Sequence, residues 1–510
     1  MWPIWGDWSS VHQVARIFSP KNSAPSEVRW AENCCGPNGH WPVDAVQQDS
    51  LLRGLVFENF DCHQPPSAAV VLSEQVSNGA AITLTGDPRF PNGLPDPAPL
   101  SPADMASPAL TDDLLSDIFL HLPEPADLVR TSAACVPFRR LVTDRAFLRR
   151  FRALHPAPLL GFLDHNGFHP ALPPHASAPA ARAVSLAADF SFSFLPSSST
   201  GRGWVVRDLR DGRVLLDRAP EDGGGDERSV FTEIAVCDPL HRRCVLLPAI
   251  PDDLAAAVDQ PLRVEFDRWC EPFLDPSGRG DPEDETSFGV ILMVQCNAKL
   301  VAFAFSSSSG QWRAPASLSW SDLMSGVGVS SRSPAFSGRQ YARGCFYWVM
   351  DWRDKLLVLD TRRMEFSIAD LPPGCHRRQI AIVEAGEGRV GMFALRDHAA
   401  DGAVSLFYTV KQDDADGSSH WQMEKTIPLD PEFRHYIRGA MERYILLLRF
   451  PEHLSSAGVH VSSSAETEDL ECFSMDVRTF QLERVCQLKH HILRAYIYTN
   501  FPPLLSPQSI

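Results

Sequence analysis

Apolar residues first adopt a regular helical spacing near residue 110. Thr111, Asp112 and Asp113 suit the start of a helix, because a capping side chain and acidic groups stabilise its free N–H groups and positive dipole end. Large apolar residues then recur at i, i+3 and i+4 spacing: Leu114, Leu115, Ile118, Phe119 and Leu122. This pattern predicts an amphipathic helix that ends at Pro123.

Two further short helices follow. Pro123 and Pro125 separate the first helix from a second one over Ala126–Ala134, and Pro137 separates that helix from a third, from Phe138 to about Arg152. A unit of roughly 40 residues is below the size that usually folds stably alone. We therefore expect part of its apolar surface to be buried against a partner.

After about Pro156 the pattern changes to short alternating runs, and no further helices are expected. One shape recurs: a strand, a polar turn, a second strand and often a Leu-Pro exit, with turns at Asp211-Gly212, Asp238-Pro239 and Asp360-Thr361. Such units recur every ~40–50 residues, within the range of propeller blades. We predict an α+β multidomain chain, a small three-helix domain followed by a β-propeller of six to eight blades, with a β-sandwich as the rival architecture.

The predicted organisation has four parts. Residues 1–105 are rich in Pro, Ala, Asp and Gly towards their end and are predicted to be a disordered leader. The helical domain covers residues 106–153, the β domain residues 158–498, and residues 499–510 form a tail. Met105 is a possible alternative start, so the leader need not belong to the native protein.

Charge and cysteine content narrow the function. A formal net charge of −16 disfavours attraction to nucleic acid or to anionic membranes. The first residues lack the pattern of a secretory signal, and no apolar run reaches the ~18–20 residues that span a bilayer. The 12 cysteines are scattered without a CxxC pair, which does not suit a disulfide framework. These features predict a cytoplasmic or nuclear protein without nucleic-acid or membrane partners.

Known catalytic and ligand-binding patterns are missing or weak. Residues 386–391 match GxGxxG but precede a strand rather than a helix, so a β-turn is expected. The group Cys34, Cys35, His40, Cys62 and His63 fits no standard zinc spacing, and Asp413, Asp414 and Asp416 read as a hairpin tip. His241, His490 and His491 are expected to be satisfied or exposed. No catalytic residue, metal ligand or cofactor is predicted.

The segment "LTDDLLSDIFLHLPEPADLVRTSAACVPFRRLV", continued by "TDRAFLRRF", resembles the F-box of eukaryotic F-box proteins. The segment "YARGCFYWVMDWRDKLLVLDTRRMEFSIADLPPG" and the "VCDP…LLP" hairpin look like the F-box-associated, kelch-like β-repeats of grass proteins of this class. Together the two parts cover roughly residues 108–490.

The resemblance implies a non-catalytic substrate receptor. Its F-box would bind the Skp adaptor and, through it, a cullin–RING ubiquitin ligase, while the β domain captures a protein target and raises its effective concentration near the ubiquitin-conjugating enzyme. Six residues are predicted to dock the adaptor, although each fits a core position about equally well: Leu110, Leu114, Leu122, Pro123, Leu128 and Phe138. Leu115, Ile118, Phe119 and Leu141 are candidates for the core.

Two departures from the family pattern keep other functions open. Thr111 stands where the family usually has Pro, and Val136-Pro137-Phe138 replaces a basic pair followed by Trp. A scaffold whose F-box no longer binds Skp, and a galactose-oxidase-like or lectin-like propeller, are the alternatives. The target-binding residues are not assigned, because the tryptophans that could anchor a partner fit the blade core better: Trp204, Trp312, Trp348, Trp352 and Trp421.

Overall fold

The computed structural model describes the chain in segments that belong to one compact unit, Ser101–Ile510. The described residues are 111–197, 203–218, 231–259, 261, 263–264, 267–268, 270–276, 286–323, 336–350, 355–372, 375, 379–397, 404–413, 419–451 and 470–510. The predicted leader, the cysteine and histidine group within it, Leu110 and Trp352 lie outside these ranges. No helix in the described segments is long and apolar enough to cross a bilayer.

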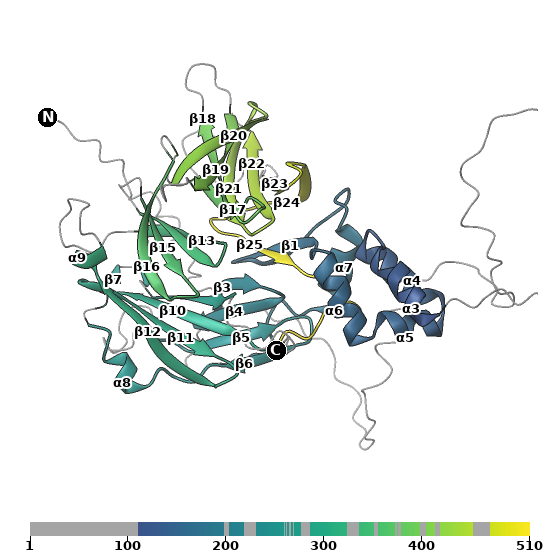
Figure 1. Ribbon diagram of the computed structural model, residues 1–510, viewed down its shortest axis with the longest axis horizontal. Coiled ribbons are helices and arrows are strands. Elements are labelled where there is room, and N and C mark those ends of the chain that lie inside the picture. Colours follow the sequence, from purple (N-terminus) through teal and green to yellow (C-terminus); the bar gives the residue numbers. More distant parts are fainter. Residues whose placement is uncertain are drawn as a thin grey trace, which may run out of the picture. The chain divides into compact units, whose positions relative to one another are not determined.

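Four short helices form one group at the start of the described chain (Figure 1): α3 (Asp112–Leu120), α4 (Pro125–Ala134), α5 (Val136–Val142) and α6 (Arg145–Leu154). The first two match the predicted helices. Thr111 caps α3, since its hydroxyl accepts a hydrogen bond from the Leu114 N–H at 3.4 Å, and Pro125 opens α4 at a position that needs no N–H partner.

The predicted third helix is in fact two helices. Thr143 ends α5, and the Asp144 carboxylate accepts a hydrogen bond from the Phe147 N–H at 2.9 Å, which starts α6 as a new helix. Pro137 does not interrupt a helix either. It lies in the first turn of α5, where its missing N–H breaks no helical hydrogen bond, so the helix begins at Val136 rather than at Phe138.

The β domain consists of antiparallel sheets. One sheet has three strands, in the order β2 (Gly167–Pro170), β1 (Leu159–Asp164) and β25 (Tyr496–Thr499). Five sheets have four strands each, and the first two of these contain β3 (Trp204–Arg210), β4 (Arg213–Arg218), β5 (Ile234–Asp238) and β6 (Arg243–Leu246), and β9 (Cys270–Asp275), β10 (Gly289–Gln295), β11 (Lys299–Ser306) and β12 (Gln311–Ser319). The other three contain β13 (Phe336–Ala342), β14 (Cys345–Met350), β15 (Lys355–Asp360) and β16 (Glu365–Asp370); β17 (Ile380–Glu384), β18 (Val390–Asp397), β19 (Val404–Asp413) and β20 (Ser419–Leu429); and β21 (Phe433–Ala440), β22 (Tyr444–Pro451), β23 (Leu470–Asp476) and β24 (Leu482–Leu488). A small hairpin pairs β7 (Arg263–Val264) with β8 (Asp267–Arg268), and two short helices are α8 (Asp252–Ala255) and α9 (Trp320–Leu323).

These six sheets are the blades of a β-propeller. In five of them the first strand in sequence lies at one edge, and these edge strands meet one another in turn: β3 with β9, β13 with β17, β17 with β21, and β21 and β3 with β25. An ion pair between Arg339 and Glu271 joins β13 to β9 and completes the ring. The predicted propeller is thus confirmed, with six blades, the lowest number expected. Radial stacking buries both faces of each sheet, which no single sheet achieves alone.

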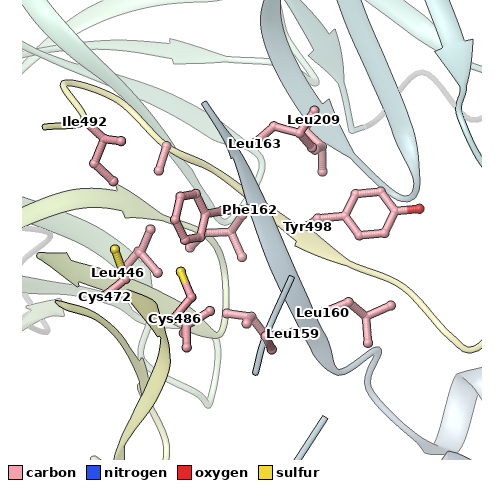
Figure 2. Packing of buried hydrophobic residues seen from close by; sticks show 14 of the residues in the cluster. Leu159, Leu160, Phe162, Leu163, Leu209, Leu446, Cys472, Cys486, Ile492 and Tyr498 are labelled. Atoms are coloured by element: carbon pink, nitrogen blue, oxygen red, sulfur yellow. The ribbon is translucent and has the colours of Figure 1, made fainter. Parts of the chain in front are cut away.

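The ring closes through strands from the two ends of the described chain. β25 pairs antiparallel with β1, as Figure 1 shows, so that Phe162 faces Ile497 across the pair. Around this junction lies a large buried cluster (Figure 2). Phe162 and Leu159 lie towards Leu446, Cys472 and Cys486 of the β21–β24 blade, whereas Leu163 lies beside Leu209 of β3. The core therefore depends on residues more than 300 positions apart in sequence.

The predicted hairpins agree with the structure where it describes them. Asp211 and Gly212 both adopt positive φ, 51° and 77°, and join β3 to β4 in a two-residue turn. The GxGxxG segment is a turn between β17 and β18, with Gly386, Glu387 and Gly388 at positive φ. At the predicted acidic hairpin tip, Asp414 and Asp416 lie outside the described residues.

The expectation that helices stop near Pro156 is wrong, because α8 and α9, of four residues each, and one longer helix follow that residue. Residues 178–187, "APAARAVSLA", form the helix α7 (Ala178–Ala187), which packs against the hairpin of β1 and β2. The segment has high helix propensity, because it is rich in Ala and its Pro lies in the first turn. It buries Ala178, Ala181 and Val184, small side chains that give a weak hydrophobic signal in sequence.

Candidate functional site

The helical unit, α3–α6, has its own small core. Leu128, Val142 and Phe151 are fully buried in it, and the rings of Phe119 and Phe138 meet edge to face with 5.0 Å between their centroids. His155 closes the end of the unit through a 2.7 Å hydrogen bond between its Nε2 and the Leu120 carbonyl oxygen. Amphipathic spacing on α3 and α6 thus produces a packed unit, as the sequence predicts.

The C-terminal segment, residues 500–510, completes this core. Phe501 and Leu505 are buried among the helices, with 6.3 Å between the ring centroids of Phe501 and Phe151. Arg152 of α6 donates a hydrogen bond of 3.1 Å to the Leu505 carbonyl oxygen. The segment that the sequence suggested to be a tail therefore contributes core residues to the helical unit.

The same C-terminal segment is held to the propeller. The Ser509 hydroxyl and N–H donate to the Asp238 carboxylate at 2.7 and 3.0 Å, and the Arg213 Nε donates to the Ser509 carbonyl oxygen at 2.7 Å. Burial would raise the pKa of Asp238, but its hydrogen bonds with His241 and Ser509 hold that pKa below its usual range. An anionic Asp238 at neutral pH thus anchors the segment that enters the helical unit.

The predicted adaptor-docking residues fall into three groups. Leu114 and Pro123 are exposed, Leu114 by 47%, and are available to a partner. Leu122 and Phe138 are half-buried against the core of the unit. Leu128 is fully buried, which makes it a core residue and removes it from any docking surface. Leu110 lies outside the described residues.

Two exposed apolar residues were not predicted for this surface. Ile118, expected as a core candidate, is 47% exposed and lies one turn from Leu114 on α3, while Val136 at the start of α5 is 72% exposed. We use the name exposed apolar set for Leu114, Ile118, Pro123, Val136 and Pro137. These residues come from α3, from the turn that follows it and from the start of α5.

The helical unit also carries charged groups on α3, α5 and α6. Asp112 and Asp113 lie in the first turn of α3, and Arg139 and Arg140 lie in the last turn of α5. Asp117 and Arg150 form an ion pair at 3.2 Å, with both side chains largely exposed. An exposed pair of this kind adds little stability. The basic run over α5 and α6 is therefore a solvated helix surface in the structure, with an acidic partner in α3.

A network of paired charges joins edge strands of neighbouring blades. Arg339 of β13 contacts Asp208 of β3 at 2.9 Å and Glu271 of β9 at 2.7 Å. The Trp348 indole N–H donates to the other Glu271 oxygen at 3.0 Å. Burial would raise the pKa of Glu271, but the Arg339 and Arg494 guanidinium groups and the Trp348 hydrogen bond lower it below its usual range. This network joins three blades, and its charges are used within the protein.

The candidate tryptophans that the structure describes share no partner surface. Trp312 and Trp348 are buried in the blades, as expected. Trp204 is half-buried beneath the Arg218 guanidinium, 3.9 Å from its ring centroid, and Trp421 donates to the Asp370 carbonyl oxygen at 3.1 Å. The position at which the propeller would hold a target therefore stays unassigned.

Comparisons with known proteins add only distant structural likenesses. No family model and no curated protein sequence matches the chain. Among solved structures, it is similar to the β-propeller domain of the trilobed protease from Pyrococcus furiosus, with 9% identity, a TM-score of 0.30, and coverage of 56% of this chain and 70% of that one. The WD40 domain of SCAP from fission yeast shares 11% identity with a TM-score of 0.26, over 58% of this chain and 67% of that one. YCF48 from Cyanidioschyzon merolae shares 9% identity with a TM-score of 0.29, over 54% of this chain and 66% of that one.

Proposed function

We propose that the chain is the substrate-receptor subunit of a Skp–cullin–F-box ubiquitin ligase. In this proposal the helical unit is an F-box that binds the Skp adaptor, and the propeller holds a protein target for ubiquitination. The chain would carry out no chemistry itself. It would act in the cytoplasm or nucleus by keeping the target close to the ubiquitin-conjugating enzyme, which raises their effective concentration.

The observation that carries the proposal is the exposed apolar set on the helical unit. Leu114 and Ile118 are each 47% exposed and Val136 is 72% exposed, although the unit has a hydrophobic core of its own. Fully burying a large apolar side chain contributes about 1.5–3 kcal/mol. A protein partner that covers these residues would therefore gain a substantial part of its binding free energy from them.

The order of the units also supports the proposal. The helices come first and the propeller follows, and the C-terminal segment packs into the helical core while Asp238 holds its end. A receptor needs such a connection, because a target brought close by one unit must stay at a defined distance from the adaptor on the other.

A binding experiment with purified Skp adaptor tests the proposal. The variant Leu114→Asp with Ile118→Asp places two charges in the exposed apolar set and leaves every buried residue of the unit in place. Replacing Leu122 would be less informative, since it is half-buried against the core. If each residue contributes as an interface hot spot, at least ~2 kcal/mol, the adaptor Kd should rise by roughly 30-fold or more per substitution.

Matched controls separate binding from folding. Leu493→Asp changes a residue that is 83% exposed outside the helical unit and should leave adaptor affinity unchanged. Thermal unfolding of both variants should match that of the unmodified chain. A folded chain that does not bind Skp would contradict the proposal and favour a scaffold with a diverged F-box, for which the Val136-Pro137-Phe138 departure would be the reason.

A further inference from the structure

A buried carboxylate surrounded by histidines lies where the propeller ring closes. Asp164 ends β1, His165 and Asn166 form the turn, and His169 lies on β2. His490 arrives from the segment between β24 and β25, 326 positions along the chain from Asp164. The Asp164 side chain is fully buried, and those of His169 and His490 are 19% and 31% exposed.

The geometry directs one nitrogen of each imidazole at this carboxylate. His169 Nε2 lies 2.9 Å from Asp164 Oδ1, and His490 Nε2 lies 2.7 Å from Oδ2. The donor atoms of all three residues lie within 4.8 Å of one another. The Asn166 N–H donates to Asp164 Oδ1 at 2.7 Å and fixes the carboxylate.

Neighbouring rings hold the imidazoles in position. The fully buried Phe162 stacks on His169 with 5.0 Å between ring centroids. His165 meets His490 edge to face at 5.6 Å, and the His169 and His490 rings are 5.4 Å apart. The three side chains are thus oriented before any ligand arrives, which reduces the entropic cost of binding one.

We propose that Asp164, His169 and His490 form a binding site for a divalent transition metal ion, with Zn²⁺ as the ion that fits best. Two imidazole nitrogens and one carboxylate oxygen are a ligand set that zinc uses, whereas Mg²⁺ and Ca²⁺ prefer oxygen ligands alone. Zinc–ligand bonds of about 2.0–2.2 Å in a tetrahedral site place ligand atoms ~3.4 Å apart. The observed 2.7 and 2.9 Å separations involve different Asp164 oxygens, so the N···O distances must widen and the two imidazoles must converge on one ion, a movement that these partly exposed side chains can make.

The charge state of the cluster agrees with this assignment. Burial would raise the pKa of Asp164, but its hydrogen bonds to His169, His490 and Asn166 lower that pKa far below its usual range, so the ligand is anionic at neutral pH. The ion would bind the Nε2 atom of each imidazole, and each imidazole would carry its proton on Nδ1. Water, or His165 after a ring rotation, would supply the fourth ligand.

A metal at this site would link the two ends of the ring. His169 and Asp164 belong to the hairpin that begins the propeller, and His490 precedes the strand that completes it. An ion that binds only the closed ring stabilises it by mass action. The site is independent of the proposed adaptor binding, because none of its residues belongs to the helical unit.

Metal titration of the full-length chain tests the proposal. After chelator treatment at pH 7.5, Zn²⁺ is titrated by calorimetry and Co²⁺ by visible absorption. We expect one equivalent of metal with a tetrahedral Co²⁺ spectrum that lacks thiolate charge-transfer bands, which excludes the cysteines as ligands. Zn²⁺ should also raise the thermal unfolding midpoint, because an ion that binds only the folded chain stabilises it.

The variants His169→Gln and His490→Gln keep a side-chain N–H that can still donate to Asp164 but remove a metal ligand. Each should lose this equivalent of metal or weaken its affinity by at least about 10–100-fold, the loss typical of even second-shell changes. His420→Gln, an exposed residue of β20, is the matched control and should bind as the unmodified chain does. The proposal would be overturned if the folded chain took up no Zn²⁺ or if both variants bound the metal unchanged. The cluster would then be a structural hydrogen-bond network.

Discussion

The helical unit and the propeller solve the same problem of burying apolar surface in different ways. The propeller closes on itself, so that residues such as Trp348 and Phe162 have neighbours on all sides within the ring. The helical unit is too small to do so. Phe501 and Leu505 of the C-terminal segment pack into its core, whereas Leu114, Ile118 and Val136 stay exposed. The difference lies in how each core is completed, because exposed apolar side chains such as Leu493 and Met423 also occur outside the helical unit.

The largest effect should come from the interior of the propeller. Trp348→Ala removes a ring that packs against Phe273, Phe336 and Phe346 and leaves Glu271 without one of its donors. We expect the free energy of unfolding to fall by about 3–5 kcal/mol. Chemical denaturation, followed by the far-ultraviolet circular dichroism of the backbone, measures this loss of free energy.

If the two regions differ as we infer, Trp348→Ala will lower the stability of the propeller without altering Skp affinity at temperatures where the chain is folded. A loss of adaptor affinity equal to that of the Leu114→Asp, Ile118→Asp variant would instead show that the regions are not separable in this way.

The next largest loss of stability is expected in the C-terminal segment, which packs into the core of the helical unit. Leu505 is fully buried among the helices, and Leu505→Ala should lower stability by about 2–5 kcal/mol. Gln508→Ala, at an exposed position of the same segment, is the control and should change stability by less than about 0.5 kcal/mol.

Hydrogen exchange can locate the effect of Leu505→Ala. Protection of the amides in α3 and α6 should fall, while the inner strands of the propeller keep theirs. Equal loss of protection in both regions would mean that the helical unit and the propeller unfold as one body.

The Asp238 anchor should give a smaller effect with a defined pH dependence. Its hydrogen bonds involve a charged acceptor, so Asp238→Asn should cost about 1.5–3 kcal/mol at pH 7. The folded pKa of Asp238 is lowered, so its contribution is present above the unfolded pKa of about 3.9 and is lost as the pH falls through the folded value.

Denaturation midpoints at pH 7, 5 and 3 test this sign. The difference between Asp238→Asn and the unmodified chain should be constant from pH 7 to 5 and shrink towards pH 3. The exposed, non-titratable change Gln508→Ala serves as the control, with no comparable pH-dependent difference. A gap that widens on acidification would exclude an anionic anchor at Asp238.

Local patterns explain what could be predicted from the sequence. The turn at Asp211-Gly212 was predictable because a two-residue hairpin needs residues that tolerate positive φ, and the strands on each side alternate regularly. The start of α3 at Thr111 was equally local. The split between α5 and α6 was missed, because Asp144 acts as a cap within a run that otherwise continues the helical pattern.

Contacts between distant residues explain what could not be predicted. Helical periodicity shows that Leu128 and Ile118 are both apolar positions, but which of them is covered depends on helices and a C-terminal segment that pack together only in the fold. The blade number depends on β25 joining β1, and the cluster of Asp164 and His490 exists only because the ring closes there. Sequence spacing carries no signal for such pairs.

The smallest effect on stability is expected within the helical unit itself. Leu114→Gln keeps helix propensity and removes an apolar group that is already half exposed, so the free energy of unfolding should change by less than about 0.5 kcal/mol. Leu128→Ala in the same unit removes a fully buried side chain and should cost about 2–5 kcal/mol. The two residues have the same chemistry, so the contrast measures their surroundings. Similar losses in both variants would mean that Leu114 is covered in the free chain, and a partner could not then use it.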